Sequence, residues 1–182
     1  EEYRDGTQEY TDEIADLLAV RPAKPWQILA ITFTNKAAGE LKERLEAMLG
    51  PDGQDIWAST FHSTCARILR RDGESIGYTS HFTIYDTDDQ KTLMKEVCRK
   101  TDIDTKRFKE RMLLSVISSA KNEMILPEEF ELNAGGDFVQ LKIAKVYKEY
   151  EAQMRANNAL DFDDLLVKTV QLLETQPDVR EN

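Results

Sequence analysis

Short apolar runs followed by helix-patterned segments constrain the fold of this chain more than any other feature. The runs span residues 28–33, 56–58 and 82–85, and each is short enough to be a buried strand. After the first two runs, apolar residues recur at the three- and four-residue spacing of a helix. Strands that alternate with helices in this way predict a parallel sheet with right-handed crossover connections.

The pattern becomes helical after Asp86. Thr87 followed by Gln90 has the spacing of a capping box and predicts a helix start, and Asp161 is expected to cap the last helix. A loop holding Pro127 and a Gly135-Gly136 hinge is expected between two of these helices. The helices predicted outside the strand–helix corners are residues 10–19, a helix that starts at Thr87, residues 105–121, residues 137–155 and the segment after 161. The chain is therefore expected to be α/β and predominantly helical, with a helical insertion in a partial parallel sheet.

The two corners where a strand leads into a helix carry the residues most suited to binding. Ligands of parallel sheets lie at the carboxyl ends of the strands, where a helix start points backbone N–H groups outward. Thr34 or Asn35 can cap the first of these helices. Phe33, Phe61 and His62 add flat faces beside hydroxyls and an amide. Single-stranded nucleic acid, whose bases stack on such faces, is the ligand that this chemistry favours.

These stretches resemble the UvrD/Rep/PcrA family of superfamily 1 DNA helicases, which are ATP-driven motors that move 3' to 5' on single-stranded DNA. Residues 32–38 are similar to motif Ia of that family and residues 60–63 to motif Ib, and both motifs line the single-strand groove. The resemblance continues through residues 82–90, 119–122 and 157–166. Five stretches in the same order and spacing over most of the chain make the resemblance specific.

The resemblance implies a domain organisation and a set of DNA contacts. Residues 1–85 would be part of the RecA-like domain 1A, residues 86–159 a helical insertion subdomain 1B, and residues 160–182 a helix returning to the RecA-like domain. Phe33 would reach a base, and Thr60 and His62 would touch the DNA backbone. The full predicted set of DNA-binding residues is Phe33, Thr34, Asn35, Lys36, Thr60, Phe61, His62, Lys121 and Asn122, the last two in the duplex-facing subdomain.

Plainer roles are open for three of these residues. Phe33 closes a strand and fits a core position, His62 fits a local hydrogen-bonding role, and Lys36 fits a surface position at a helix start. Asp161, Asp163 and Asp164 could suggest a metal site, but no histidine or fourth carboxylate is spaced to complete it, so helix capping is the preferred interpretation. We expect no catalytic and no metal-ligating residue.

The phosphate-binding chemistry of such a motor is missing from the printed sequence. A glycine-rich loop ending in Gly-Lys-Ser or Gly-Lys-Thr is needed to cradle ATP and Mg²⁺, and the nearest candidate, Arg4-Asp5-Gly6-Thr7, has no lysine. The acidic strand that the family uses to hold magnesium would lie beyond residues 177–179. We therefore expect a segment of a larger ATP-dependent helicase that binds no ATP or metal and is inactive by itself.

Charge and composition qualify this interpretation. The formal net charge of −10 opposes binding to phosphates, yet residues 91–121 hold nine basic and four acidic side chains. Such a basic face is expected to bind duplex DNA weakly and in a salt-dependent way. Cys65 and Cys98 lie among apolar residues and are expected to be free thiols. No apolar run is long enough to span a membrane, so a cytoplasmic location without membrane contact is expected.

Two other classes of protein remain compatible with the sequence. A non-catalytic adaptor could keep the helicase-like corners as relics and dock other proteins through its acidic surfaces. A helicase-nuclease would share the same corners and carry its nuclease part outside this segment. The pathway served, whether DNA repair or replication, is not readable from these residues.

Overall fold

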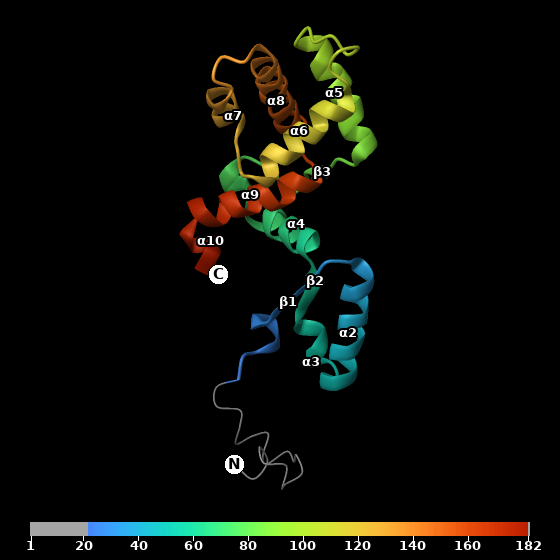
Figure 1. The fold of residues 1–182 in the computed structure, drawn as a ribbon. Coiled ribbons are helices and arrows are strands. Elements are labelled where there is room, and N and C mark those ends of the chain that lie inside the picture. Colours follow the sequence, from blue (N-terminus) through green and yellow to red (C-terminus); the bar gives the residue numbers. More distant parts are fainter. Residues whose placement is uncertain (1–21, 182) are drawn as a thin grey trace, which may run out of the picture. The chain divides into compact units, whose positions relative to one another are not determined.

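The computed structural model describes residues 22–181, which form two compact units divided between Thr60 and Phe61 (Figure 1). The domain boundary that the sequence predicts, at residues 85–86, stays a prediction. The helix after Thr60 packs against the last long helix of the chain. The helix expected at residues 10–19 lies outside the described residues.

Unit 1 is built on two parallel strands. It contains a short 3-10 helix η1 (Pro25–Gln27), strand β1 (Leu29–Thr32), helices α2 (Asn35–Leu49) and α3 (Asp52–Asp55), and strand β2 (Trp57–Thr60). The strands pair in register from Leu29 with Trp57 to Thr32 with Thr60. Both predicted strands and their parallel pairing are thus confirmed, and β1 and β2 end side by side.

Local signals fix both ends of α2. Thr34 is the N-cap, and its hydroxyl oxygen accepts a hydrogen bond of 3.1 Å from the N–H of Ala37. The helix ends at Gly50, whose φ is 62°. Glycine adopts this backbone conformation without steric strain because it has no Cβ. Gly53 is needed for a different reason: a Cβ there would lie 2.5 Å from the carbonyl oxygen of Leu45, so no side chain fits.

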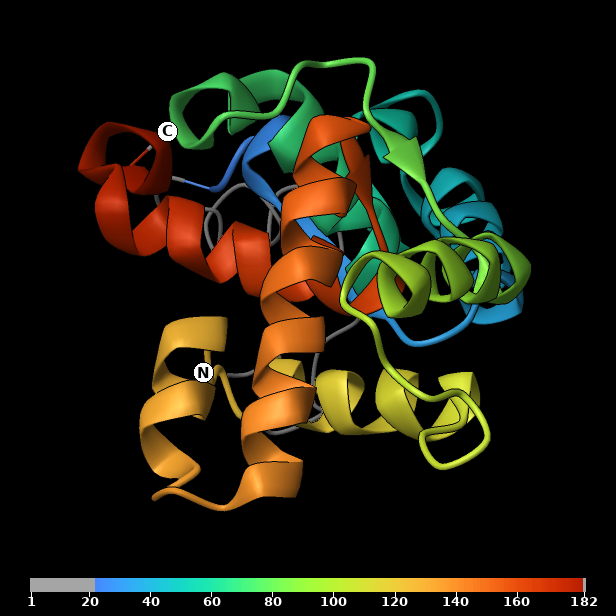
Figure 2. The same ribbon diagram turned by 90° about the horizontal axis from the view of Figure 1, so that it is seen from above.

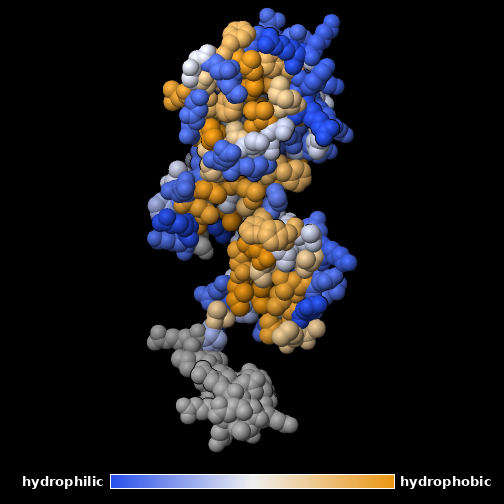
Figure 3. Space-filling model, viewed as in Figure 1, coloured by the Kyte–Doolittle hydropathy of each residue, from blue (hydrophilic) through white to orange (hydrophobic). Residues whose placement is uncertain are grey.

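Unit 1 buries few apolar side chains among the described residues. Ala38, Ile56 and Ala58 are buried, whereas Leu29 is 48% and Met48 80% exposed. Figure 3 shows a broad apolar surface on the viewed face of this unit.

Unit 2 is mainly helical. It contains α4 (Phe61–Asp72), η2 (Gly73–Ile76), β3 (Thr83–Ile84), α5 (Thr87–Lys100), α6 (Glu110–Asn122), α7 (Pro127–Asn133), α8 (Phe138–Ala156), β4 (Ala159–Leu160), α9 (Phe162–Thr175) and α10 (Pro177–Glu181). Helices α5, α6 and α8 enclose one apolar core, and α7 lies beside α8 (Figures 1 and 2). A second core joins α4 to α9 through Cys65, Leu69, Leu165 and Leu172.

Strand β3 was expected to join the first two strands, but it pairs with β4. The two form a separate parallel ladder with Thr83 opposite Ala159 and Ile84 opposite Leu160. Ala159 and Leu160 are fully buried, which favours their pairing inside unit 2. The helical segment between the two strands therefore leaves and returns at neighbouring positions.

Asn158 closes the connection into β4. Its φ of 47° lies in the left-handed region, which asparagine tolerates better than most residues. Its side-chain oxygen accepts a bond of 3.1 Å from the N–H of Thr79, and its amide donates one of 2.7 Å to the Thr79 hydroxyl.

Replacing Asn158 by alanine should lower the free energy of unfolding of unit 2 by about 2 kcal/mol, because two hydrogen bonds are lost and alanine is strained at this φ. Glycine at the same position relieves only the strain, so Asn158→Gly should recover part of the loss. Urea denaturation followed by circular dichroism measures both. Equal stability of the asparagine and alanine proteins would contradict this role.

Several helix boundaries differ from the sequence prediction for local reasons. Helix α5 is capped by Asp86 with Asp89 as its capping-box partner, one residue earlier than the predicted Thr87–Gln90 box. Helix α6 begins at Glu110 rather than at 105, because the backbone turns at Asp104, whose carboxylate accepts the N–H of Lys106. The expected loop contains α7, with Pro127 at its first position, where proline costs no hydrogen bond.

The Asp86 cap makes a prediction about pH. Hydrogen bonds from the N–H groups of Asp89 and Asp88 hold the pKa of Asp86 below its ordinary value. A depressed pKa in the folded state contributes stability above pH 4 that is lost as the pH falls through the folded pKa. We expect wild type to be more stable than Asp86→Asn at pH 7, and the difference to shrink below pH 4 in urea denaturation. A pH-independent difference would contradict this assignment.

Both cysteines are buried and free, as expected. Burial raises the pKa of the Cys65 and Cys98 thiols, which keeps them protonated and unreactive at neutral pH. No helix in residues 22–181 is long and apolar enough to cross a membrane.

Candidate nucleic-acid interface

The corner after β1 presents an aromatic ring to solvent. Phe33 follows the last residue of the strand and is 88% exposed, so the core role considered for it is wrong. Thr32 stabilises the corner by donating its hydroxyl hydrogen to the carbonyl of Thr34 at 3.2 Å. Exposure of a large apolar ring is unfavourable in water, which makes Phe33 a candidate for binding.

Polar groups of the same corner surround the start of α2. Thr34, Asn35 and Lys36 are all exposed. The Thr34 hydroxyl accepts a bond as N-cap and retains its hydrogen for donation. Lys36 lies 4.0 Å from Glu40 with both side chains exposed, an ion pair worth little in water. Its ammonium can therefore exchange this carboxylate for another anion at little cost.

The corner after β2 carries two rings, those of Phe61 and His62. Thr60 ends β2 with 7% exposure, so its side chain offers little surface to a ligand. Phe61, the first residue of α4, is 41% exposed. His62 is half-buried, and its ring lies 5.7 Å from that of Phe162 at an interplanar angle of 72°, an edge-to-face contact.

The sequence interpretation missed Phe162. This residue opens α9 and is 50% exposed beside His62. Its place within residues 157–166 was recognised, but the pattern of a capped amphipathic helix gave no reason to single out its first apolar residue. The structure thus places a further exposed ring of unit 2 next to a predicted site residue.

Lys121 does not occupy the surface position expected for a DNA contact. Its side chain is 2% exposed, and its Nζ lies 2.8 Å from carboxylate oxygens of Glu151, Asp161 and Asp164. Burial alone would lower the pKa of Lys121, but the carboxylates of Asp164, Glu151 and Asp161 hold it well above its ordinary value. A buried ammonium shared by three carboxylates cannot meet a phosphate in this conformation, so we withdraw Lys121 from the DNA-binding set.

The capping interpretation of the aspartates is confirmed. Asp161 is the N-cap of α9: its Oδ1 accepts the N–H of Asp164 at 2.8 Å, and the Asp164 carboxylate accepts the N–H of Asp161 at 3.1 Å. Burial raises the pKa of Asp164 to about 7. No group of three or more histidine, cysteine or acidic side chains in the described part of the chain is arranged to hold a metal ion.

Asn122 ends α6 and is exposed. Its side chain is therefore accessible, unlike that of its neighbour Lys121. Its role stays a prediction.

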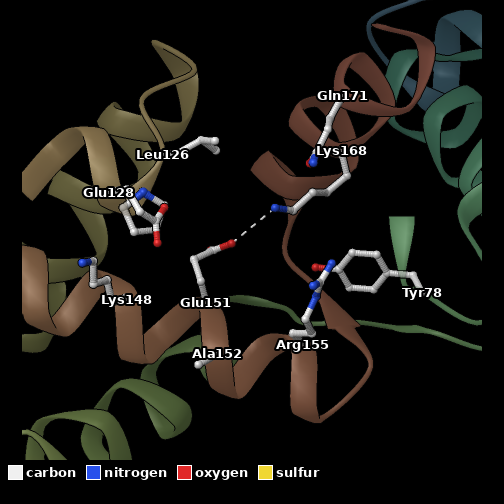
Figure 4. A pocket seen from close by; sticks show the side chains of 10 residues that line it. Tyr78, Leu126, Glu128, Lys148, Glu151, Ala152, Arg155, Lys168 and Gln171 are labelled. Carbon is white, nitrogen blue, oxygen red and sulfur yellow. Dashed lines mark hydrogen bonds and ion pairs between the residues drawn. The ribbon is translucent and has the colours of Figure 1, made fainter. Parts of the chain in front are cut away.

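A separate hollow of about 370 Å³ lies in unit 2 between α7, α8 and α9. In Figure 4, Glu151 and Lys168 face each other in this pocket, 3.5 Å apart. Arg155, beside Tyr78, donates to the carbonyl of Ile76 at 2.7 Å. None of the residues predicted to bind DNA lines the pocket.

Comparison with known proteins supports the resemblance seen in the sequence. The family model of the UvrD/REP helicase N-terminal domain matches residues 7–182. The ATP-dependent DNA helicase PcrA of Bacillus subtilis (strain 168) is 49% identical over 175 residues, which are 96% of this chain and 24% of that protein. PcrA of Staphylococcus aureus (strain Mu50 / ATCC 700699) is 46% identical over the same shares. The chain thus spans about a quarter of the length of these relatives.

Proposed function

Since the chain belongs to the UvrD/REP helicase N-terminal domain family, we propose that it forms part of an ATP-dependent DNA helicase and supplies contacts to single-stranded DNA. The observation that carries the proposal is the 88% exposure of Phe33 at the carboxyl end of a parallel strand. Nucleic-acid bases stack on such rings whatever their sequence, which suits a motor that must move along DNA.

Each corner carries both an aromatic ring and polar groups that could contact single-stranded DNA. At the first, Phe33 would stack on a base while Thr34, Asn35 and Lys36 bind the neighbouring phosphates. At the second, Phe61 and His62 would contact the strand, with Phe162 completing the apolar side of His62. Asn122 stays in the set as a duplex-facing residue. Thr60 would act mainly by ending β2, since its side chain is buried.

The finer features of the parent helicase are part of this proposal. We propose 3' to 5' movement, a role in DNA repair or replication and a cytoplasmic location, the last consistent with two free thiols. The parent would supply ATP and Mg²⁺ binding, because the printed sequence contains no Gly-Lys-Ser or Gly-Lys-Thr loop. Residues 86–159 would be the 1B insertion, which the pairing of β3 with β4 supports.

Fluorescence anisotropy with a labelled oligothymidylate tests the proposal. Wild type should bind the single strand more tightly than a duplex of equal length, and the affinity should fall as salt rises. Phe33→Ala and His62→Ala should each weaken binding. The adaptor alternative predicts equal affinities for all three proteins, and that result would overturn the DNA-binding assignment.

Lys36 gives a separate prediction about salt. If its ammonium meets one phosphate, Lys36→Ala should reduce the slope of log affinity against log salt by about 0.7, the value for one contact to a single strand. Lys42→Ala, an exposed lysine on the same helix, is the matched control and should leave the slope nearly unchanged. Equal slopes for the two variants would exclude a phosphate contact at Lys36.

A further inference from the structure

The buried ion cluster of Lys121, Glu151, Asp161 and Asp164 has no part in the proposed DNA contacts. We propose that Lys121 is a positioning residue, which fixes the first turn of α9 and thereby holds the ring of Phe162 against His62. The inference rests on the proposed function only for its effect on DNA affinity, because the geometry of His62 can be measured without DNA.

One lysine joins three elements of unit 2. Lys121 lies in the last turn of α6, Glu151 lies in α8, and Asp161 and Asp164 form the start of α9. All three carboxylates approach the ammonium to 2.8 Å. Charges buried this deeply are stable only when paired, so α9 can begin only where both of its aspartates reach Lys121.

The same two aspartates build the capping box. Oδ1 of Asp161 accepts the Asp164 N–H, while its Oδ2 lies 2.8 Å from Lys121 and accepts the hydroxyl of Tyr150 at 3.2 Å. Asp164 uses one oxygen for the Asp161 N–H and approaches Lys121 with the other. Each carboxylate therefore divides its two oxygens between the helix backbone and the lysine.

Phe162 stands between these two aspartates in the chain. Its backbone is fixed on both sides by the capping box, and its ring meets His62 edge-on at 5.7 Å. The two rings lie in the first turns of α9 and α4, and these helices also share the core of Leu69 and Leu165. A displaced first turn of α9 would move the Phe162 ring while the later turns stay packed on α4.

Removing the ammonium leaves the buried carboxylates of Asp161 and Asp164 and the partly exposed carboxylate of Glu151, which repel one another. Of the three carboxylates, all in the described part of the chain, Lys168 forms an ion pair with Glu151 alone, at 3.5 Å, so it cannot replace Lys121 at the two aspartates. The carboxylates relieve the repulsion by moving toward solvent or by taking up protons. Either change removes the constraint that keeps the side chains of Asp161 and Asp164 in place at the start of α9.

Proton NMR of the histidine side chains reads this geometry directly. The chain has two histidines, His62 and the exposed His81, and His62→Gln assigns their signals. In both Lys121→Met and Phe162→Leu, the His62 signal should lose the change in chemical shift that the Phe162 ring causes. The chemical shift of the His81 signal should not change in either variant. Lys148→Met, which breaks a more exposed ion pair with Glu131, is the charge-matched control and should leave both signals unchanged.

A second variant covers the case in which Lys121→Met does not fold. Asp161→Asn keeps a good capping oxygen but loses the charge that meets Lys121, and it should move the His62 signal in the same direction by a smaller amount. Lys121→Arg, which keeps the charge, should restore part of the Lys121→Met change. An unchanged His62 signal in both Lys121→Met and Asp161→Asn would overturn the inference.

The affinity for oligothymidylate separates positioning from direct contact. If Lys121 is a positioning residue, folded Lys121→Met should bind oligothymidylate about tenfold more weakly than wild type, a loss within the range for one stacked base. The slope of log affinity against log salt should be unchanged. A slope lower by about 0.7 with an unchanged His62 signal would show a direct phosphate contact and overturn the inference. Lower stability with unchanged signal and affinity would show a merely structural role, which also overturns it. If wild type itself does not bind oligothymidylate, the proposed function fails. The His62 signal then still shows whether Lys121 holds the Phe162 ring against His62.

Discussion

Lys121→Met should lower the free energy of unfolding of unit 2 by about 3–5 kcal/mol, the usual effect of leaving buried charges without their partner. The side chain is 2% exposed and faces three carboxylates, so water cannot replace the lost ammonium. Lys148→Met, at a side chain 39% exposed, should cost less than about 1 kcal/mol. Urea denaturation followed by circular dichroism gives both values.

The pH dependence of this loss follows from the same carboxylates. In the variant, they can relieve their repulsion by binding protons, and burial already raises the pKa of Asp164 to about 7. The destabilisation should therefore be largest near pH 8 and shrink as the pH falls toward 5. In wild type, the raised pKa of Lys121 contributes stability that is present below pH 10 and lost only at higher pH. A loss in Lys121→Met that stays no larger than the loss in Lys148→Met over the whole range from pH 5 to pH 8 would contradict the buried cluster.

Phe33→Ala should weaken binding to oligothymidylate by tenfold or more, because stacking on one aromatic side chain contributes about 1–3 kcal/mol per base. The ring is 88% exposed, so its removal should leave the unfolding free energy nearly unchanged. Phe33→Trp keeps an aromatic face and should retain most of the affinity. Anisotropy titrations at fixed salt measure all three proteins.

Met48 provides the matched control for this prediction. It is 80% exposed in the last turn of α2, about 20 Å along the helix from the corner that holds Phe33. Met48→Ala should bind DNA like wild type. Equal losses in Phe33→Ala and Met48→Ala would indicate a general effect of surface hydrophobicity rather than a stacking site.

Sequence patterns predicted the features that depend on neighbours in the chain. The strands predicted at residues 28–33 and 56–58 are present as Leu29–Thr32 and Trp57–Thr60. Of the two predicted cap residues of α2, Thr34 is the N-cap, and Asp161 caps α9 as predicted. The exposure of Phe33 was left open, because a strand-closing aromatic fits a core as well as a surface. The exposure of the Phe33 ring is determined by the tight corner before α2.

Features that depend on distant residues could not be predicted in this way. Lys121 looks like an ordinary helix-end lysine until α8 and α9 bring three carboxylates around it. The contact of Phe162 with His62 likewise joins the starts of two helices far apart in sequence. The pairing of β3 with β4 was missed because Ala159-Leu160 is too short to stand out as a strand.

Photo-crosslinking to oligothymidylate, with the attached peptides located by mass spectrometry, tests most directly whether the two corners hold single-stranded DNA. We predict crosslinks in the peptide that contains Phe33 and in the one that contains Phe61 and His62, and their loss at Phe33 in the Phe33→Ala protein. Crosslinks confined to other surfaces, such as α7 or the outer face of α5, would contradict the account.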